Sequence, residues 1–498
     1  MSGQKRSIPA IPDPRSYLWL AVVAVLGPFT NGKWVIPLAA WLGPVFTIRF
    51  LRSQPPLRGF ILCIFVVIGI IILSVKGLVP IPGIGFYVFA VITAVVSLLP
   101  YLVDRLIVHR VGGFVSTFVF PCAVTTLEYV NSHGPFGSWG SIAYTQHGNL
   151  PLIQMVSVTG LWGLTFLMSW SASVVNWAWE QDFDWRRVRV GVGGYAGILV
   201  FILLSGGARL AFFPPESDTV RVASLTKSQI FTGAAISGKD SQTLRTEFQA
   251  NNADLLAGCE REARAGAKII FWAEVNAIVM KENEMELIQR GRELARREGI
   301  YLGMAIGSLP PGDKPLFENK VVLIEPSGEV AWEYLKARPV PGEGSVPGDG
   351  RIHTTDTPYG RISSVICFDT DFPSHVRQAG KAGVDLLFAP SNDWKEAMTP
   401  HMVVASFRAI ENGFTLIRPT SHGFAAAVDY HGQILSKMDA FRTRDGAMVS
   451  YVPIRGITTI YSQIGDGFAW MCILGLIALL VWAVILHRGT IPQGQSGG

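Results

Sequence analysis

Long apolar runs separated by short polar connections occupy the first part of the chain. They lie at about 16–30, 33–50, 58–75, 82–103, 111–130, 155–179 and 189–213, and one more lies near 467–487. Most are long enough to cross roughly 30 Å of hydrocarbon, which takes about 20 residues. The first two are short and broken by Pro28 and Pro37, so a re-entrant hairpin is the alternative to two full spans there. The pattern predicts a membrane domain at 1–213 with about seven helices, a last membrane helix at 467–487 and a tail at 488–498.

Between residues 214 and 466 the apolar positions fall instead in short β-rich runs that alternate with amphipathic helical stretches. The strings TVRVASL, KIIFWAE, YLGMAIGSL, VDLLFAP, FTLIRPT and AAAVDYHGQILSK predict strands, and 241–265, 284–298 and 400–412 predict helices. Two hairpins are expected, one turning at Pro326 to Gly328 and one within 352–367. This mixed order predicts a layered α/β domain inserted between the seventh and eighth membrane helices.

Composition and charge agree with a membrane protein that carries a soluble part. Hydrophobic residues make up 49% of the chain and charged residues 16%, and the mean hydropathy is +0.34. The net charge of +5 belongs to the membrane half: residues 1–213 hold 14 Lys and Arg against 6 Asp and Glu, and the remainder holds 28 against 31. A nucleic-acid-binding protein would need clustered cations on the soluble half, so that class is excluded.

The distribution of Lys and Arg predicts the orientation of the chain, because cations are retained on the cytoplasmic side. Basic residues precede the first span, separate the second from the third, the fourth from the fifth and the sixth from the seventh, and follow the last. The short loops of the opposite side contain only Lys33 and Lys76. We therefore expect cytoplasmic termini and an extracytoplasmic domain at 214–466.

Neither a disulfide framework nor a metal site is predicted. The five cysteines are scattered, and the chain has no CxxC pair, no HExxH and no close His/Cys ligand spacing. His401, at the start of the helix expected at 400–412, is interpreted as a helix cap, with ligand orientation as the alternative. Glu128 lies in or beside a membrane span, where an ionisable group suggests a function such as contact with a lipid headgroup.

Three residues that could carry chemistry stand at the ends of apolar strands: Glu274 in IIFWAEVNA, Lys336 in AWEYLKARPVPGEG and Cys367 in ISSVICFDTDFP. A glutamate can take the proton of a thiol, the thiolate can attack a carbonyl, and an ammonium can stabilise the oxyanion. Each residue also has a structural interpretation: Cys367 as core, Lys336 as a solvated hairpin end and Glu274 as a helix cap.

The strings WAEVNA, YLKARPVPGEG, VICFDTDFP, APSNDW and HMVVASFRAIENG, in this order, resemble the carbon–nitrogen hydrolase (nitrilase) superfamily. The resemblance implies an αββα sandwich and a Glu-Lys-Cys triad at Glu274, Lys336 and Cys367. With seven spans before the sandwich and one after it, the chain resembles the apolipoprotein N-acyltransferase family. LPLIQMVSVTGLWGLTFLM and TSHGFAAAVDYHGQI also resemble segments of that family.

This resemblance implies a ping-pong acyl transfer at the cell (inner) membrane, on its periplasmic side. A phospholipid would donate an acyl chain to Cys367 as a thioester, and the α-amino group of an S-diacylglyceryl-cysteine lipoprotein would accept it. No cofactor is implied. Eight spans favour a monomer, although soluble nitrilase-like proteins often assemble through their sandwiches.

Other positions are expected to support the triad. Glu343 in PGEG matches the loop glutamate of the family, with an exposed turn residue as the alternative. Phe368 and Asp369 stand where the family usually has Tyr and Glu, so the hydrogen bonds there are expected to differ. Trp394 in SNDW is either a pocket wall or a core aromatic, and the core is favoured. Arg408 and Glu411 are expected to form a structural helix pair.

Two departures from the family pattern concern substrate choice. The segment LEYVNSHGPFGSW keeps Glu128 but lacks the arginine that the family usually has there, and the stretch between Glu274 and Lys336 is short, which suggests a trimmed lid. A membrane-anchored amidase or nitrilase acting on a small amide is therefore the alternative function. A transporter or receptor with a decayed nitrilase-like domain is disfavoured because all three triad residue types are present.

Overall fold

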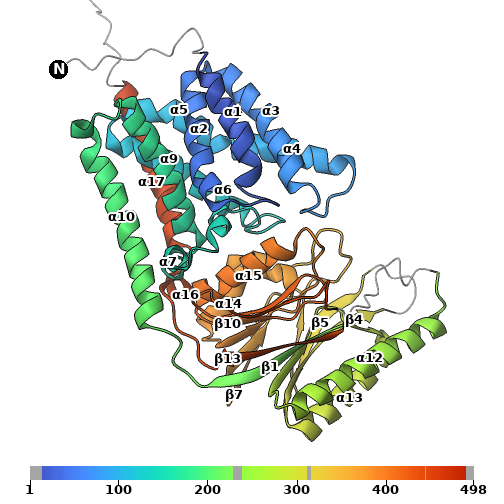
Figure 1. Ribbon diagram of the computed structural model, residues 1–498. Coiled ribbons are helices and arrows are strands. Elements are labelled where there is room, and N and C mark those ends of the chain that lie inside the picture. Colours follow the sequence, from blue (N-terminus) through green and yellow to red (C-terminus); the bar gives the residue numbers. More distant parts are fainter. Residues whose placement is uncertain (1–13, 228–237, 311–315, 444, 489–498) are drawn as a thin grey trace, which may run out of the picture. The chain divides into compact units, whose positions relative to one another are not determined.

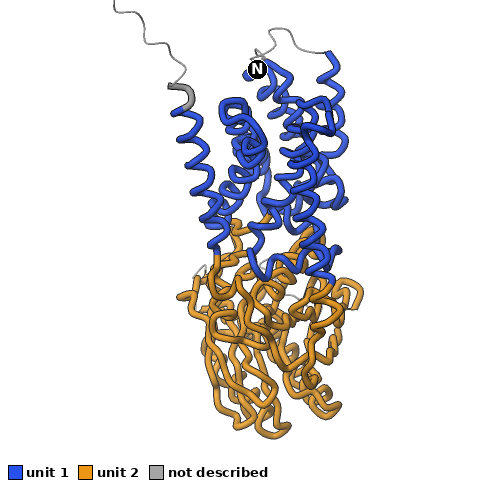
Figure 2. The backbone as a smooth tube through the Cα atoms, turned by 90° about the vertical axis from the view of Figure 1, so that its left-hand side faces the viewer, with its two compact units in different colours: residues 1–134, 140–207, 466–498 blue, residues 135–139, 208–465 orange. Residues whose placement is uncertain are grey.

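The computed structural model describes residues 14–227, 238–310, 316–443 and 445–488. The chain divides into two compact units, coloured separately in Figure 2. Unit 1 comprises residues 1–134, 140–207 and 466–498, and unit 2 comprises residues 135–139 and 208–465. Unit 2 thus includes a short segment, 135–139, that the sequence pattern places within the membrane half.

Unit 1 is helical. Its principal helices are α1 (Ser16–Leu26), α2 (Pro37–Ser53), α3 (Pro56–Val75), α4 (Ile84–Ser97), α5 (Leu99–Val111), α6 (Val119–Asn131), α9 (Leu161–Glu180), α10 (Trp185–Phe212), which continues into unit 2, and α17 (Gly467–Arg488). Short helices α7 (Leu150–Ile153) and α8 (Val156–Thr159) precede α9. Each predicted apolar run therefore forms helix, although α1 has only 11 residues and α2 has 17 with Pro44 inside it.

Within the described residues, four helices are long and apolar enough to cross a membrane: 56–75, 84–111, 185–212 and 467–485. Three precede the α/β domain and one follows it, so the protein is a multi-pass membrane protein. The other predicted spans correspond to helices that are shorter or less apolar.

The Glu128 side chain is hydrogen-bonded within unit 1. Glu128 on α6 accepts hydrogen bonds from Ser141 Oγ at 2.7 Å, from Thr165 Oγ1 at 2.6 Å and from the Ile142 N–H at 3.0 Å. Both of its carboxylate oxygens are thus bonded within unit 1, and these contacts favour an anchor between α6 and α9 over a contact with a lipid headgroup.

Unit 2 is a sandwich of two β-sheets covered by helices on both outer sides (Figure 1). The described residues form a seven-stranded sheet, ordered β13-β1-β2-β4-β5-β6 with β3 also paired to β4, and a six-stranded sheet, ordered β12-β11-β10-β9-β8-β7. Helices α12 (Ser241–Arg264) and α13 (Glu284–Glu298) lie outside the first sheet, and α14 (Pro373–Lys381) and α15 (Met398–Asn412) lie outside the second. The predicted layered α/β architecture is confirmed.

The strands follow the predicted order. The first sheet contains β1 (Thr219–Thr226), β2 (Ile269–Trp272), β3 (Ala277–Met280), β4 (Tyr301–Leu309), β5 (Glu318–Ile324), β6 (Val330–Leu335) and β13 (Gly446–Pro453). The second contains β7 (Thr354–Thr357), β8 (Gly360–Ser364), β9 (Leu386–Phe388), β10 (Thr415–Arg418), β11 (Phe424–Val428) and β12 (Ile434–Asp439). Both predicted hairpins form, as β5–β6 and β7–β8. The pattern missed β3, β13, α14 and the short helix α16 (Ile460–Ile464).

The core lies between the two sheets and joins them through aromatic packing. Phe271 of β2 stacks on Phe388 of β9 with ring centroids 3.8 Å apart and an interplanar angle of 6°. A Cβ at Gly303 of β4 would lie 2.2 Å from the Phe271 ring, so only glycine leaves room for this stack. Both β2 and β9 are fully buried, which fixes the strand ends at which the candidate site residues stand.

Candidate active site

Glu274 stands where the chain leaves one strand and enters the next. Strands β2 and β3 both pair in parallel with β4, and residues 273–276 interrupt them. Val275 has a φ of 50°, a conformation that is costly for a β-branched residue and marks a position held by its surroundings. This break directs the chain out of the sheet at Glu274, whose residue is 4% exposed.

Lys336 follows β6 directly and pairs with two carboxylates. Its Nζ lies 2.8 Å from Glu274 Oε1 and 2.5 Å from Glu343 Oε2. Asn319 of β5 bridges the same pair, because its Nδ2 donates to Glu274 Oε1 at 2.8 Å and to Glu343 Oε1 at 2.9 Å. Glu343 also accepts from the Val340 N–H and from Ser345 Oγ, each at 2.9 Å. Glu343 is therefore not an exposed turn residue, and Lys336 is not a solvated hairpin end.

Cys367 opens the 3₁₀ turn η5 (Cys367–Asp371) shortly after β8. It has a φ of 48° and donates its backbone N–H to the Pro390 carbonyl at 2.9 Å. A non-glycine residue at positive φ stores strain of order 1–3 kcal/mol, and such positions cluster at functional sites. The residue is 4% exposed, so its thiol sits in a largely dry environment.

The charges of these groups act on one another. Burial raises the pKa of the Cys367 thiol and the Glu274 carboxylate adds to that rise, whereas His401 and Lys336 lower it. Burial opposes the charge of Lys336, but Glu274, Cys367 and Glu343 outweigh it, so the pKa of the ammonium is raised. The structure therefore brings the three predicted triad residues into one electrostatic cluster.

The two carboxylates on Lys336 are shifted in opposite directions. Burial raises the pKa of Glu274, although Lys336 partly offsets it. Burial acts in the same sense on Glu343, but there Lys336 and the hydrogen bonds outweigh it, and its pKa is lowered. Two neighbouring carboxyl groups whose pKa values are shifted in opposite directions are typical of a pair with two roles: one stays charged as a counterion, and the other exchanges protons.

The Asp369 carboxylate holds the Cys367 turn in place through three hydrogen bonds. Its carboxylate accepts hydrogen bonds from Tyr334 Oη and from the Arg338 N–H, each at 2.7 Å, and from the Ile366 N–H at 2.9 Å. These bonds tie the Cys367 turn to the stretch on either side of Lys336. The Phe368 ring packs edge-on against Phe372 with centroids 5.4 Å apart.

Two further sequence predictions concern the environment of Trp394 and the pairing of Arg408 with Glu411. Trp394 is half-buried and does not belong to the fully buried core that the sequence favoured for it. Arg408 and Glu411 are fully buried, and their side chains lie 3.1 Å apart on α15, which confirms the structural helix pair.

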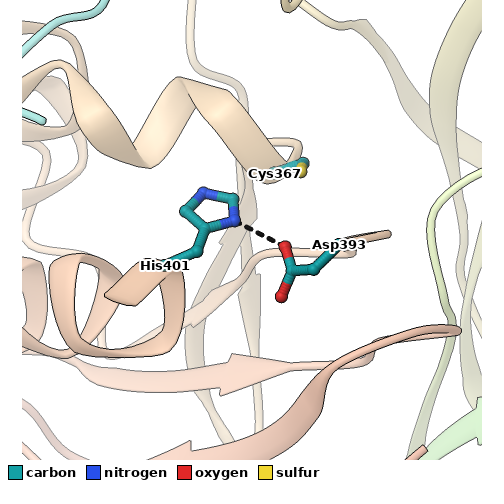
Figure 3. A group of neighbouring side chains, drawn as sticks. All are labelled: Cys367, Asp393 and His401. Atoms are coloured by element: carbon teal, nitrogen blue, oxygen red, sulfur yellow. Dashed lines mark hydrogen bonds and ion pairs between the residues drawn. The ribbon is translucent and has the colours of Figure 1, made fainter. Parts of the chain in front are cut away.

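Sequence reasoning missed a second cluster beside Cys367 (Figure 3). The Cys367 sulfur, a carboxylate oxygen of Asp393 and a ring nitrogen of His401 lie within 4.8 Å of one another, and each of these atoms is able to bind a metal ion. The capping interpretation of His401 is wrong, because α15 begins at Met398 and places His401 inside its first turns. The side chain contacts Asp393 instead, at 2.6 Å from Nδ1 to Oδ1. The only local signals were the polar pair in SNDW and a histidine on an otherwise apolar helix face.

Two known protein families match parts of this chain. The carbon-nitrogen hydrolase family matches residues 207–455, and the apolipoprotein N-acyltransferase N-terminal domain matches residues 19–174. The chain belongs to the apolipoprotein N-acyltransferase family. Both halves of the family's architecture are thus present in one chain.

Relatives of this family are distant in sequence. The apolipoprotein N-acyltransferase of Geobacter metallireducens is 27% identical over 440 residues, covering 81% of this chain and 81% of that protein. Apolipoprotein N-acyltransferase 2 of Treponema pallidum is 24% identical, covering 76% and 78%. Among solved structures, an amidase of Nesterenkonia AN1 from the nitrilase superfamily is 21% identical, covers 52% of this chain and 99% of its own, and has a TM-score of 0.41.

Proposed function

We propose that this protein is an N-acyltransferase that moves an acyl chain from a phospholipid, through a thioester on Cys367, to the α-amino group of an S-diacylglyceryl-cysteine lipoprotein. The observation that carries the proposal is the buried Lys336 ammonium held between Glu274 and Glu343, with its charge acting on the Cys367 thiol. Its presence in a chain of the apolipoprotein N-acyltransferase family supports this choice of donor and acceptor.

In the first half-reaction, Glu274 takes the thiol proton and the Cys367 sulfur attacks the ester carbonyl of the phospholipid. Lys336 stabilises the oxyanion that forms as the carbonyl π-bond opens. The intermediate collapses with cleavage of the ester C–O bond, and Glu274 returns its proton to the departing oxygen. The products are the Cys367 thioester and a lysophospholipid.

In the second half-reaction, the lipoprotein amine attacks the thioester carbonyl. Glu274 takes a proton from the amine, the C–S bond breaks, and the proton passes to the departing sulfur. An amide and the free Cys367 thiol result. Because a thioester is also open to water, the dry surroundings of Cys367 favour transfer over hydrolysis.

Glu343 keeps its charge through the cycle in this proposal. Its lowered pKa and its four hydrogen-bond donors make it the fixed counterion of Lys336, which leaves Glu274 free to exchange protons. Phe368 and Trp394 are proposed to contribute to the walls of the substrate site, and Asp369 to position the Cys367 turn.

In this proposal the chain crosses the membrane about eight times, seven times within 1–213 and once at 467–487. Helices that are shorter or less apolar than the four candidate helices then also span the membrane. The alternation of basic connections supports cytoplasmic termini, a cytoplasmic tail at 488–498 and a catalytic domain at 214–466 on the periplasmic side of the inner membrane. A monomer acting on lipid and lipoprotein in the same membrane fits this arrangement.

The test uses the full-length protein in detergent, a phospholipid with a labelled acyl chain and an S-diacylglyceryl-cysteine peptide. We expect labelled N-acyl peptide and an equal amount of lysophospholipid. A matched peptide with a blocked α-amino group must accept nothing. Release of labelled free fatty acid without acylated peptide, or cleavage of small amides alone, would contradict the proposal and favour the amidase alternative.

A further inference from the structure

His401 lies between two buried carboxylates beside Cys367. Its Nδ1 is 2.6 Å from Asp393 Oδ1, and its Nε2 is 3.0 Å from Asp371 Oδ2. The imidazole comes from α15, Asp371 from the end of η5 and Asp393 from the loop after β9, so three separate elements converge on one ring. Figure 3 shows His401 and Asp393 of this group beside Cys367. Both aspartate side chains are at most 1% exposed.

Two carboxylates beside one imidazole, one at each nitrogen, favour a ring that carries two protons. A carboxylate only accepts hydrogen bonds, so a proton on each ring nitrogen suits both neighbours, and a ring protonated at both nitrogens is an imidazolium. Burial opposes this charge, but Asp371 and Asp393 outweigh it and raise the pKa of His401.

The charge balance of the surroundings points the same way. Arg418 Nη2 on β10 lies 2.8 Å from both oxygens of Asp393 and 3.0 Å from His401 Nδ1. On α15, Arg408 is paired with Glu411. Burial raises the pKa of Asp371, and the charges of His401 and Arg408 oppose that rise. Two ionised aspartates are balanced by two cations: Arg418 supplies one, and a protonated His401 beside both carboxylates supplies the second and leaves these four side chains neutral.

A metal ion fits this cluster less well, although Cys367, Asp393 and His401 are all possible ligands. The Arg418 guanidinium already stands against both Asp393 oxygens and His401 Nδ1. A divalent cation would have to displace a buried positive group from its carboxylate, so the cluster is better described as a protein-made cation site filled by Arg418 and His401.

We propose that His401 is a fixed imidazolium that stabilises the Cys367 thiolate from the side of α15, as a second cation in addition to Lys336. This inference rests on the proposed role of Cys367 as the nucleophile. Sulfur carries negative charge twice in the cycle, when Cys367 attacks the ester and when the amine expels it. His401 holds its own proton throughout, because both of its protons are committed to Asp371 and Asp393, and Glu274 remains the proton acceptor.

The contacts around Cys367 support this placement. The Cys367 sulfur lies within 4.8 Å of a His401 ring nitrogen. Burial raises the pKa of the thiol, and the charge of the imidazole lowers it. Thr370 Oγ1 donates to the Cys367 carbonyl at 2.8 Å and lies 3.4 Å from His401 Nε2, so the turn and the ring are held together.

The segment 135–139 closes the cluster from another direction within unit 2. Ser138 donates to the Asp371 carbonyl from both N–H and Oγ, each at 2.7 Å. The Trp139 ring lies 6.0 Å from the His401 ring, centroid to centroid. A segment far earlier in the sequence thus fixes Asp371 and covers the imidazole, which keeps the ion pair in a low dielectric where it acts strongly.

The experiment measures alkylation of Cys367 by iodoacetamide as a function of pH in the full-length protein in detergent, with the Cys367 peptide quantified by mass spectrometry. His401→Gln removes the charge and keeps a polar side chain. We expect its Cys367 to label roughly ten- to a hundredfold more slowly at neutral pH, which corresponds to one to two pKa units of the thiol. The labelling curve should move to higher pH and reach a similar plateau.

His431→Gln is the matched control, because His431 is also buried, at 1% exposure, and lies in the turn after β11. It should label like the wild type. Asp371→Asn covers the case in which His401→Gln does not fold: it weakens the imidazolium without removing the ring, and we expect a smaller shift in the same direction. A labelling curve for His401→Gln or a folded Asp371→Asn that coincides with the wild type would overturn the inference.

The labelling data, together with a search for an acyl adduct after incubation with phospholipid, separate this inference from the proposed function. If wild-type Cys367 reacts at no pH, the nucleophile itself is wrong and both proposals fail. If wild-type Cys367 reacts and forms an acyl adduct while the His401→Gln curve is unchanged, the proposed function stands and the role of His401 falls.

Discussion

Replacing Glu343 by Gln should shift the pH dependence of acyl transfer in a direction that the geometry dictates. The substitution keeps the shape of the side chain and removes one negative charge next to Glu274. Glu343 accepts from Lys336 and Val340 through Oε2 and from Asn319 and Ser345 through Oε1. In either orientation of the new amide its nitrogen meets a donor, Asn319 Nδ2 or Lys336 Nζ, so the fold of the variant is checked by its thermal midpoint before the pH profile is compared.

The size of the shift follows from the distance between the two carboxylates. Lys336 Nζ lies 2.8 Å from Glu274 Oε1 and 2.5 Å from Glu343 Oε2, so these two oxygens are at most about 5 Å apart. Two unit charges at about 5 Å repel by about 3 kcal/mol at an effective dielectric constant of about 20. The repulsion is equivalent to about two pKa units. Since it favours protonation of Glu274, removing it lowers the pKa of Glu274.

The assay is the pH profile of kcat/KM for transfer to a diacylglyceryl-cysteine peptide. We expect the acid limb of Glu343→Gln to move to lower pH by roughly one to two units, and the plateau to fall because a carboxylate of lower pKa is a weaker base. Ser345→Ala, which removes one hydrogen bond but no charge, should leave the acid limb in place. An acid limb that stays where it is in Glu343→Gln, or that moves to higher pH, would refute the assignment of Glu274 as the base.

Two other predictions concern stability. Glu284 is buried and paired with Lys320, and its pKa is lowered because its hydrogen bonds and Lys320 outweigh the effect of burial. Its contribution is therefore present above its ordinary pKa of about 4.3 and is lost as the pH falls through the depressed value; Glu284→Gln should lower the thermal midpoint at neutral pH, with the difference from the wild type shrinking in acid. A Cβ at Gly137, where φ is 56°, would lie 2.4 Å from the Asp371 carbonyl oxygen, so Gly137→Ala should lower the midpoint more than Gly140→Ala, which has positive φ but open space; equal midpoints would contradict the predicted clash.

The residues that local sequence could identify are those at the ends of buried strands. Glu274, Lys336 and Cys367 each follow a run of apolar residues, and a rigid sheet presents such positions at its edge. The hairpins were also predictable, because their turns lie within a few residues of the strands that they join. Strand β13 was not, since its partner β1 lies more than 200 residues earlier and the pairing leaves no local signal.

The remaining parts of the site depend on contacts across the chain. Asp369 follows the cysteine, yet its bracing role appears only when Tyr334 and the Arg338 N–H meet its carboxylate. His401 sits on a helix face like any core residue until Asp371 and Asp393 reach it from two other elements. Local pattern gives residue types and strand ends, whereas charge compensation in a buried cluster is a property of the folded chain.

The central claim is that Cys367 carries the acyl chain between donor and acceptor. The most direct measurement incubates the full-length protein with phospholipid alone and maps acyl adducts by mass spectrometry, with Cys367→Ala as the control. We predict a single acyl chain on the Cys367 peptide that disappears when a diacylglyceryl-cysteine peptide is added, and no adduct in the variant. Transfer that proceeds in Cys367→Ala, or an adduct confined to another residue, would contradict the account.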